Sequence, residues 1–208
     1  GILKKLGWPF SRKSEAGGIP NGIKGDQRDD ETAQVYEIPP DYPTVKDPDL
    51  PFEQLNCVQS FFRDHYNPNR NCVVQLGTGT GKTGLAYIAS RYKLDEGKRT
   101  ITMGPTRELV RDLEKSAIGV WGAGVVARNI GDDRNLAGKN YIITTPEGYI
   151  SAVRQQKEWT EAHLLIVDEG HKVLEPGRSE ALDAAITIHR QKGGLVILMS
   201  GTLPLKEK

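Results

Sequence analysis

The chain has 208 residues, a net charge of +1, 37% hydrophobic residues and 26% charged residues, which is typical of a soluble globular protein with one α/β domain and an extension. The near-neutral balance excludes bulk attraction to nucleic acid, so any such contact must come from a local patch or from backbone amides. No apolar run approaches the roughly 20 residues that span a bilayer, and the two cysteines, Cys57 and Cys72, lack the spacing of a zinc site. We therefore expect an intracellular protein, cytoplasmic or nuclear, with reduced thiols and no membrane span.

The first region of the chain, residues 1–48, differs from the rest. Glycine and proline recur in it, and no helical or strand period persists. We expect a flexible or extended N-terminal arm. Its apolar start, residues 2–10 beside Lys4 and Lys5, is suited to docking on a partner or a membrane surface, and we favour the alternative, a disordered tail.

Residues 49–208 show helical patterns that alternate with short apolar strands. Strands are expected at 72–76, 100–103, 125–130, 141–144, 164–167 and 195–199, and helices at 54–66, 82–93, 107–120, 179–190 and from the strand at 141–144 to residue 154. Continuous apolar strands between helices indicate an α/β fold, a parallel sheet with helices on both faces. Right-handed crossovers place the loops after the strands at one edge of that sheet.

The first chemical motif lies between the strand at 72–76 and the helix at 82–93. It is the run Gly77, Thr78, Gly79, Thr80, Gly81, Lys82 and Thr83. In this context the glycines let backbone N–H groups converge on phosphate oxygens at a helix N-terminus. Lys82 is expected to reach the β and γ phosphates of ATP, and the Thr83 hydroxyl to bind Mg²⁺. Leu76 replaces the first glycine of the general pattern, and the alternative is a glycine-rich turn with a chance Lys-Thr pair.

The second motif, Asp168-Glu169-Gly170-His171, follows the apolar strand at 164–167. A carboxylate at this end of a strand, beside the phosphate loop, can hold magnesium through water, which is the role expected of Asp168. Glu169 is expected to orient and deprotonate the attacking water. The alternative is a solvated acidic strand end. With Lys82, these two carboxylates are the candidate catalytic residues.

In their order, these motifs resemble the first RecA-like domain of superfamily 2 helicases of the DExH type, over about residues 50–208. Besides the two motifs above, the resemblance rests on segments 105–109 (Pro-Thr-Arg-Glu-Leu), 144–147 (Thr-Thr-Pro-Glu) and 200–202 (Ser-Gly-Thr). Finer details look like the Ski-two-like branch: Leu55-Asn56 before Gln59, Gly131-Asp132, and Arg178 with Leu182-Asp183.

The resemblance implies specific roles for further residues. Gln59, 23 residues before Lys82, would read adenine, and Phe52 or Tyr42 would cover the base. The alternatives are an exposed helix residue for Gln59 and a core or surface aromatic for the other two. Three residues would hold the backbone phosphates of DNA or RNA without sequence preference: Thr106, Arg107 and Thr145. Another three would couple the nucleotide state to domain movement: His171, Ser200 and Thr202. For Arg107 the alternative is an ordinary surface arginine at a helix start.

The resemblance also implies ATP-dependent helicase or translocase activity, with ATP and Mg²⁺, once a second RecA-like domain is present in cis or trans. The chain ends at Lys208 without the Gln-x-x-Gly-Arg-x-x-Arg type of sequence found in that second domain. We therefore expect residues 49–208 to be the first domain of a pair that alone turns ATP over poorly. The alternative from another class is a non-enzymatic, ATP-dependent binding or scaffold module. A third possibility, a nucleotide kinase, lacks support because a kinase does not need the segments at 105–109, 144–147 and 200–202.

Overall fold

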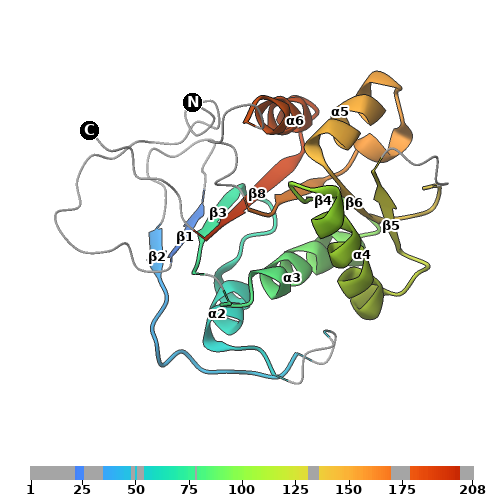
Figure 1. The fold of residues 1–208 in the computed structure, drawn as a ribbon. Coiled ribbons are helices and arrows are strands. Elements are labelled where there is room, and N and C mark those ends of the chain that lie inside the picture. The colour runs from blue at the N-terminus through green and yellow to red at the C-terminus, as the bar shows by residue number, and fades with distance from the viewer. Residues whose placement is uncertain are drawn as a thin grey trace, which may run out of the picture.

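The computed structural model describes residues 22–25, 35–47, 50, 54–77, 79–130, 136–169 and 179–201. Its centre is a sheet in which the described strands follow the order β2-β1-β3-β8-β7-β4-β6-β5 (Figure 1). The strands are β1 (Gly22–Gly25), β2 (Val35–Glu37), β3 (Cys72–Gln75), β4 (Thr100–Met103), β5 (Val126–Asn129), β6 (Tyr141–Thr144), β7 (Leu164–Val167) and β8 (Leu195–Ser200). From β3 to β5 all neighbouring strands are parallel, so the predicted parallel α/β sheet is confirmed.

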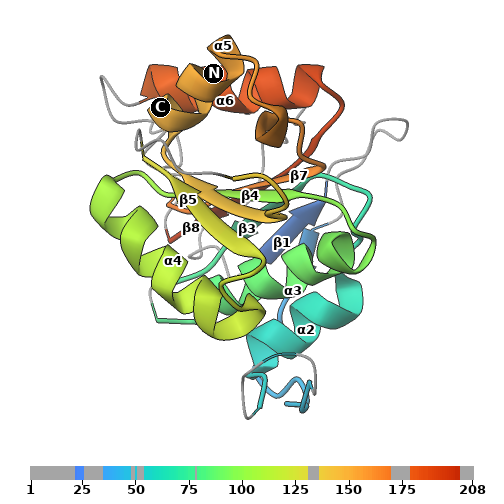
Figure 2. The same cartoon turned by 90° about the vertical axis from the view of Figure 1, so that its right-hand side faces the viewer.

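Helices cover both faces of the sheet, as Figure 2 shows. One face carries α2 (Cys57–His65), α3 (Lys82–Asp95) and α4 (Arg107–Trp121), and the other carries α5 (Pro146–Arg154) and α6 (Ser179–Gln191), with the short 3-10 turn η1 at Glu158–Thr160. The described part of the chain contains no helix that is long and apolar enough to cross a membrane.

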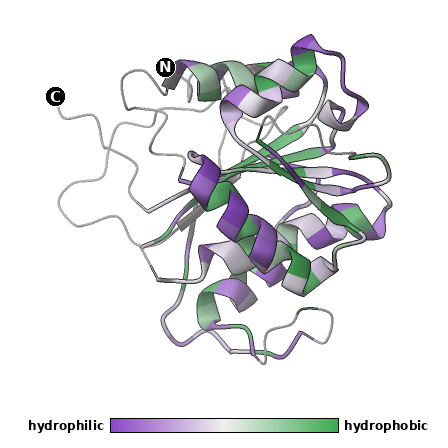
Figure 3. Ribbon diagram, turned by 45° about the vertical axis from the view of Figure 1, so that its right-hand side comes forward, coloured by the Kyte–Doolittle hydropathy of each residue, from purple (hydrophilic) through white to green (hydrophobic). Residues whose placement is uncertain are grey.

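Two hydrophobic cores lie on the two faces of the sheet. Alternate residues of each strand belong to different cores: Val74 and Ile166 pack with α2, α3 and α4, whereas Val73 and Leu165 pack with α5 and α6. This alternation is the period of two that a strand imposes on its side chains. Because both faces are covered, the strands read as continuous apolar runs, and Figure 3 shows them as a hydrophobic layer between helices with hydrophilic outer surfaces.

Two short strands, β1 and β2, were not predicted for the N-terminal region. β1 pairs antiparallel with β3, with Ile23 opposite Val74, and β2 pairs antiparallel with β1. An edge strand offers a row of unpaired N–H and C=O groups, which explains why even a glycine-rich segment is recruited beside β3. The first predicted helix also begins later than residue 54, because Asn56 caps α2 at Cys57.

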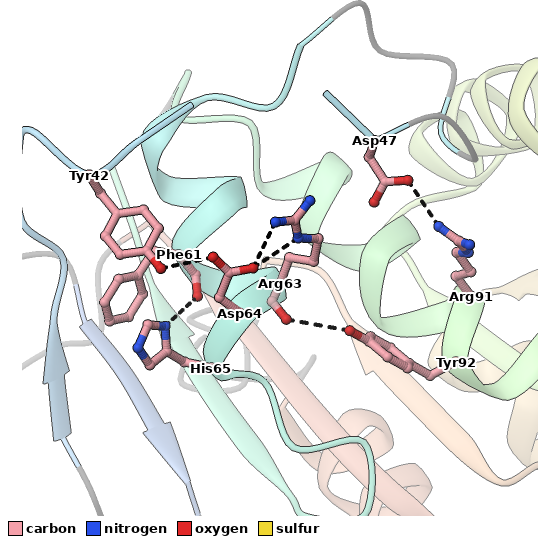
Figure 4. Close-up of polar contacts among 8 residues, drawn as sticks. All are labelled: Tyr42, Asp47, Phe61, Arg63, Asp64, His65, Arg91 and Tyr92. Carbon is pink, nitrogen blue, oxygen red and sulfur yellow. Dashed lines mark hydrogen bonds and ion pairs between the residues drawn. The ribbon is translucent and has the colours of Figure 1, made fainter. Parts of the chain in front are cut away.

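Residues 38–47, which we name the strap, pack against α2 and α3 (Figure 4). The hydroxyl of Tyr42 donates to the Asp64 carboxylate at 2.9 Å, and its ring meets the edge of Phe61 with centroids 5.1 Å apart. At the other end of the strap, the buried carboxylate of Asp47 pairs with Arg91 at 2.9 Å. The strap therefore connects the β2 side of the sheet to the helices that precede and follow the glycine-rich loop.

Candidate nucleotide and nucleic-acid site

The predicted site residues lie where parallel strands end at one edge of the sheet. β3 ends before the glycine-rich loop and β7 ends before Asp168, and both strands pair with β8, which ends at Ser200. The register places Gln75 opposite Ser200, and the N–H of Leu76 donates to the carbonyl of Ser200 at 3.0 Å. The loop and the acidic pair therefore flank one strand end, as the crossover rule predicts.

The glycine-rich loop, of which all residues but Thr78 are described, has the backbone of an anion site. Gly79 and Gly81 have φ angles of 79° and 86°, in the left-handed region that favours glycine. Gly81 is the N-cap of α3, and no side chain of the described residues caps that helix, an arrangement that an anion completes. The ammonium of Lys82 donates to the carbonyls of Leu76 and Gly77 at 3.2 and 3.1 Å, so the loop's own oxygens hold this cation in place.

The N-terminus of α2 also contacts this loop. Asn56 and Gln59 form a capping box, in which each side-chain oxygen accepts from the other residue's backbone N–H, at 2.9 and 3.1 Å. Their side-chain amides donate onward, Asn56 to the carbonyl of Thr80 at 3.1 Å and Gln59 to that of Gly81 at 3.2 Å. Gln59 is 7% exposed, so the alternative of an exposed helix residue is wrong, while adenine reading stays a prediction. The contact of Asn56 was not predicted, although the Asn-x-x-Gln capping signal points to its place in the fold.

The acidic pair follows β7 in a constrained turn. The N–H of Asp168 donates to the carbonyl of Met103 at 3.0 Å, and the Asp168 carboxylate accepts from the N–H of Glu169 at 2.9 Å. Glu169 has a φ angle of 57°, which is uncommon for a residue other than glycine. Such strain costs about 1 kcal/mol or more and concentrates at functional sites. This backbone distinguishes Glu169 from an ordinary strand end, and its catalytic role stays a prediction.

The oxygen donors at this edge fit a magnesium ion held together with nucleotide phosphates. The described residues contain no group of three or more His, Cys, Asp or Glu side chains suited to a metal. Magnesium in nucleotide sites keeps several waters, binds phosphate oxygens and needs one or two protein ligands. The Asp168 carboxylate and the Thr83 hydroxyl are ligands of this type at the same sheet edge, so this donor set suits Mg²⁺ and not a dedicated all-protein cage.

The predicted nucleic-acid residues lie at the starts of α4 and α5. Thr106 and Thr145 are the N-caps of these helices, and their hydroxyl oxygens accept from the N–H groups of Leu109 at 3.2 Å and Gly148 at 3.1 Å. Each hydroxyl can still donate its own proton. Arg107 is exposed as the first residue of α4. The two helix starts are neighbours, because β4 and β6 pair in parallel up to the ends where these helices follow.

A small hollow joins this surface to the acidic pair. Its lining includes Gly104 and Pro105 before α4, Pro146 at the start of α5, and Asp168. A larger hollow of about 730 Å³ lies at the opposite sheet edge, between Lys98 and Leu195, and contains none of the predicted site residues. Ser200, for which a coupling role was predicted, is fully buried at the end of β8. Thr78, His171 and Thr202 lie outside the described residues, as do Phe52, Arg178 and the Gly131-Asp132 pair.

Comparisons with known proteins agree with this geometry. The model of the DEAD/DEAH box helicase family matches residues 54–208. The RQC trigger complex helicase SLH1 of Saccharomyces cerevisiae is 31% identical over 150 residues, 66% of this chain and 8% of that protein. The ATP-dependent RNA helicase DBP9 of Phaeosphaeria nodorum is 32% identical over 148 residues, 64% of this chain and 25% of that protein. The ATP-dependent DNA helicase MER3 of Saccharomyces cerevisiae is 27% identical over 156 residues, 65% of this chain and 13% of that protein.

Solved structures show the same fold. The helicase domain of Hef from Pyrococcus furiosus matches with a TM-score of 0.59 and 19% identity, over 72% of this chain and 34% of that chain. A hypothetical ATP-dependent RNA helicase from Sulfolobus tokodaii matches with a TM-score of 0.60 and 23% identity, over 74% of this chain and 48% of that chain. The RecA-like fold class is thereby confirmed. The chain spans at most a quarter of the length of the curated relatives described above.

Proposed function

This chain belongs to the DEAD/DEAH box helicase family, and on that premise we propose that it is the ATP-binding half of an ATP-dependent nucleic-acid helicase or translocase. One observation carries the proposal: the glycine-rich loop, the acidic pair and two neighbouring helix starts lie at the same edge of the sheet. This edge is where open α/β sheets bind their ligands. A nucleotide and a nucleic-acid strand would therefore contact adjoining parts of one surface.

In this proposal the glycine-rich loop binds the triphosphate of ATP. Lys82 exchanges the carbonyls of Leu76 and Gly77 for β and γ phosphate oxygens, which are stronger partners for an ammonium because they are charged. Thr83 and Asp168 hold Mg²⁺, which supplies charge neutralisation at the phosphates when it is bound. Gln59 reads adenine with the second amide hydrogen and the second lone pair that its contacts leave over.

Hydrolysis is assigned to Glu169, which takes a proton from the attacking water. The hydrogen bond from its N–H to Asp168 and its left-handed backbone support this role, because they fix the turn before any substrate arrives. Ser200, at the end of the strand between the loop and the acidic pair, is proposed to couple the nucleotide state to domain movement, together with His171 and Thr202.

The nucleic-acid strand is proposed to bind across the starts of α4 and α5. Thr106 and Thr145 donate their hydroxyl protons to backbone phosphates, and the exposed guanidinium of Arg107 supplies charge. Helix N-termini add a favourable dipole for anions. Contacts of this kind carry no sequence information, so the proposed substrate is DNA or RNA of any sequence.

Completion of the site is proposed to require a second RecA-like domain, in cis or in trans. Within the family, the Asp168 to His171 sequence supports the DExH type, and the similarity to SLH1 and MER3 supports the Ski-two-like branch. An intracellular location, cytoplasmic or nuclear, follows from this proposed work on nucleic acid.

The test of the proposed function is nucleotide binding by Lys82→Ala. Loss of charged hydrogen bonds to the phosphates should weaken the binding of a fluorescent ATP analogue with magnesium roughly 10- to 100-fold. The matched control is Lys98→Ala, because Lys98 pairs with Glu96 and lines the hollow at the opposite sheet edge. Unchanged affinity in Lys82→Ala, or an equal loss in both variants, would contradict the phosphate-loop assignment.

A further inference from the structure

Two side-chain amides at the start of α2 donate hydrogen bonds to consecutive peptide groups of the glycine-rich loop. Asn56 binds the carbonyl of Thr80, and Gln59 binds the carbonyl of Gly81. All described peptide bonds here are trans, and in a planar trans peptide the C=O and the following N–H point in opposite directions. Holding these two carbonyls toward α2 therefore directs the N–H groups of Gly81 and Lys82 away from α2.

A notch between two glycines seats the Gln59 amide. A Cβ at Gly81 would lie 2.6 Å from Nε2 of Gln59, and a Cβ at Gly84 would lie even closer to the same atom. Gly84 lies inside α3 and its φ is not in the left-handed region, so its backbone does not require glycine. Glycine in a helix costs about 1 kcal/mol relative to alanine, and close contact with Gln59 is the reason that the structure offers for it.

Helix capping alone does not explain why position 56 is an asparagine. Serine, threonine and aspartate cap a helix N-terminus about as well as asparagine does. Of these four, asparagine combines the capping oxygen with N–H donors that reach the carbonyl of Thr80, 24 residues further along the chain. The cap thus explains the oxygen of Asn56, while the contact with the loop explains its nitrogen.

We infer that Asn56 is a positioning residue of the nucleotide site, which with Gln59 preorganises the phosphate-binding N–H groups of Gly81 and Lys82. Binding a phosphate to amides that already point the right way avoids the entropic cost of ordering the loop. The effect acts on the triphosphate and is independent of the base. It rests on the proposed function, in that the loop is taken to bind a nucleotide.

The experiment uses one conservative variant of the 208-residue chain. Asn56→Ser keeps a capping oxygen for α2 and adds no charge, but it cannot reach the carbonyl of Thr80. Competition against a fluorescent ATP analogue measures affinities for ATP, GTP and inorganic tripolyphosphate, each with magnesium. Loss of one net hydrogen bond should weaken all three ligands roughly two- to tenfold. Amide hydrogen exchange of residues 79–84 should become faster without any ligand.

The matched control is Asn67→Ser, because Asn67 also caps a turn, by accepting from Asn69 beyond the other end of α2. This control should leave all three affinities unchanged. Asn56→Ser should melt only about 1–6 °C below wild type, because its cap is kept and one net hydrogen bond is lost. A loss confined to ATP would assign the effect to base reading and overturn the inference, as would wild-type exchange and affinity in Asn56→Ser. If the unmodified chain and Lys82→Ala bind tripolyphosphate equally, the proposed function itself fails, and the inference fails with it.

Discussion

Acidification should destabilise this chain through one buried imidazole. His189 in α6 is fully buried, with Nε2 3.1 Å from the carbonyl oxygen of Leu195 and Nδ1 3.5 Å from the Tyr149 hydroxyl. Burial lowers the pKa of His189 from 6.5 to about 4. The ring is therefore neutral in the folded chain at pH 7, and between these two values the unfolded chain binds more protons. The difference between the folded and unfolded pKa values, at 1.36 kcal/mol per pKa unit, contributes about 3 kcal/mol to the free energy of unfolding. This contribution is complete above pH 6.5, falls as the pH drops, and is lost below about pH 4.

Urea unfolding between pH 7.5 and 4 measures this contribution when wild type is compared with His189→Gln. Glutamine does not titrate and keeps an N–H donor for the carbonyl of Leu195, while the carboxylates titrate alike in both proteins. The stability difference between the two should therefore change by about 2–3 kcal/mol in favour of the variant across this range. His163→Gln, at an exposed position, is the comparison; partial burial lowers the pKa of His163 in the same direction, so this variant should show a smaller change of the same sign. A stability difference between wild type and His189→Gln that stays constant with pH would refute the reasoning.

Three further predictions concern the proposed activity. In the protein extended by its second domain, Glu169→Gln should keep ATP affinity and lower phosphate release about 100-fold or more, because an amide cannot accept the proton from water; turnover near wild type would assign the base elsewhere. Arg107→Ala should weaken single-stranded DNA or RNA binding equally for all sequences, and lower the slope of log affinity against log salt by about 1 in an anisotropy titration. Arg111→Ala, one turn along α4, is its control, and an equal loss in both would count against this contact. The 208-residue chain alone should release phosphate near background with or without nucleic acid, because cations from a second domain contribute roughly 10³ to 10⁵ in rate; several turnovers per second would contradict the half-site proposal.

Local signals made the frame of the site predictable. Apolar runs such as residues 164–167 identify buried strands, and the handedness of crossovers then brings the ends of β3, β7 and β8 together without any knowledge of side-chain contacts. Glycines in the loop follow from backbone geometry alone. For these reasons the glycine-rich loop and the acidic pair were placed correctly at one sheet edge.

Contacts between distant segments were beyond this reasoning. The bond from Asn56 to the carbonyl of Thr80 and the seat of Gln59 against Gly84 depend on how α2 meets α3, which no short pattern encodes. The left-handed turn at Glu169 is imposed by the surroundings on a residue that does not prefer it. β1 pairs with β3, which would otherwise be an edge strand. The sequence of neither strand on its own predicts this pairing.

The strap lies before the region that matches the family, yet it packs against that region. The family match begins at residue 54, yet the N–H of Leu55 donates to the carbonyl of Val45 at 2.8 Å and the Gln54 amide donates to the Thr44 hydroxyl at 2.6 Å. A protein shortened to the matched region would lose these bonds and the buried Asp47 that pairs with Arg91, and it would uncover apolar surface of α2. We therefore expect the strap to fold together with the matched region, so a protein that begins at residue 54 should be less stable than one that includes residues 38–47.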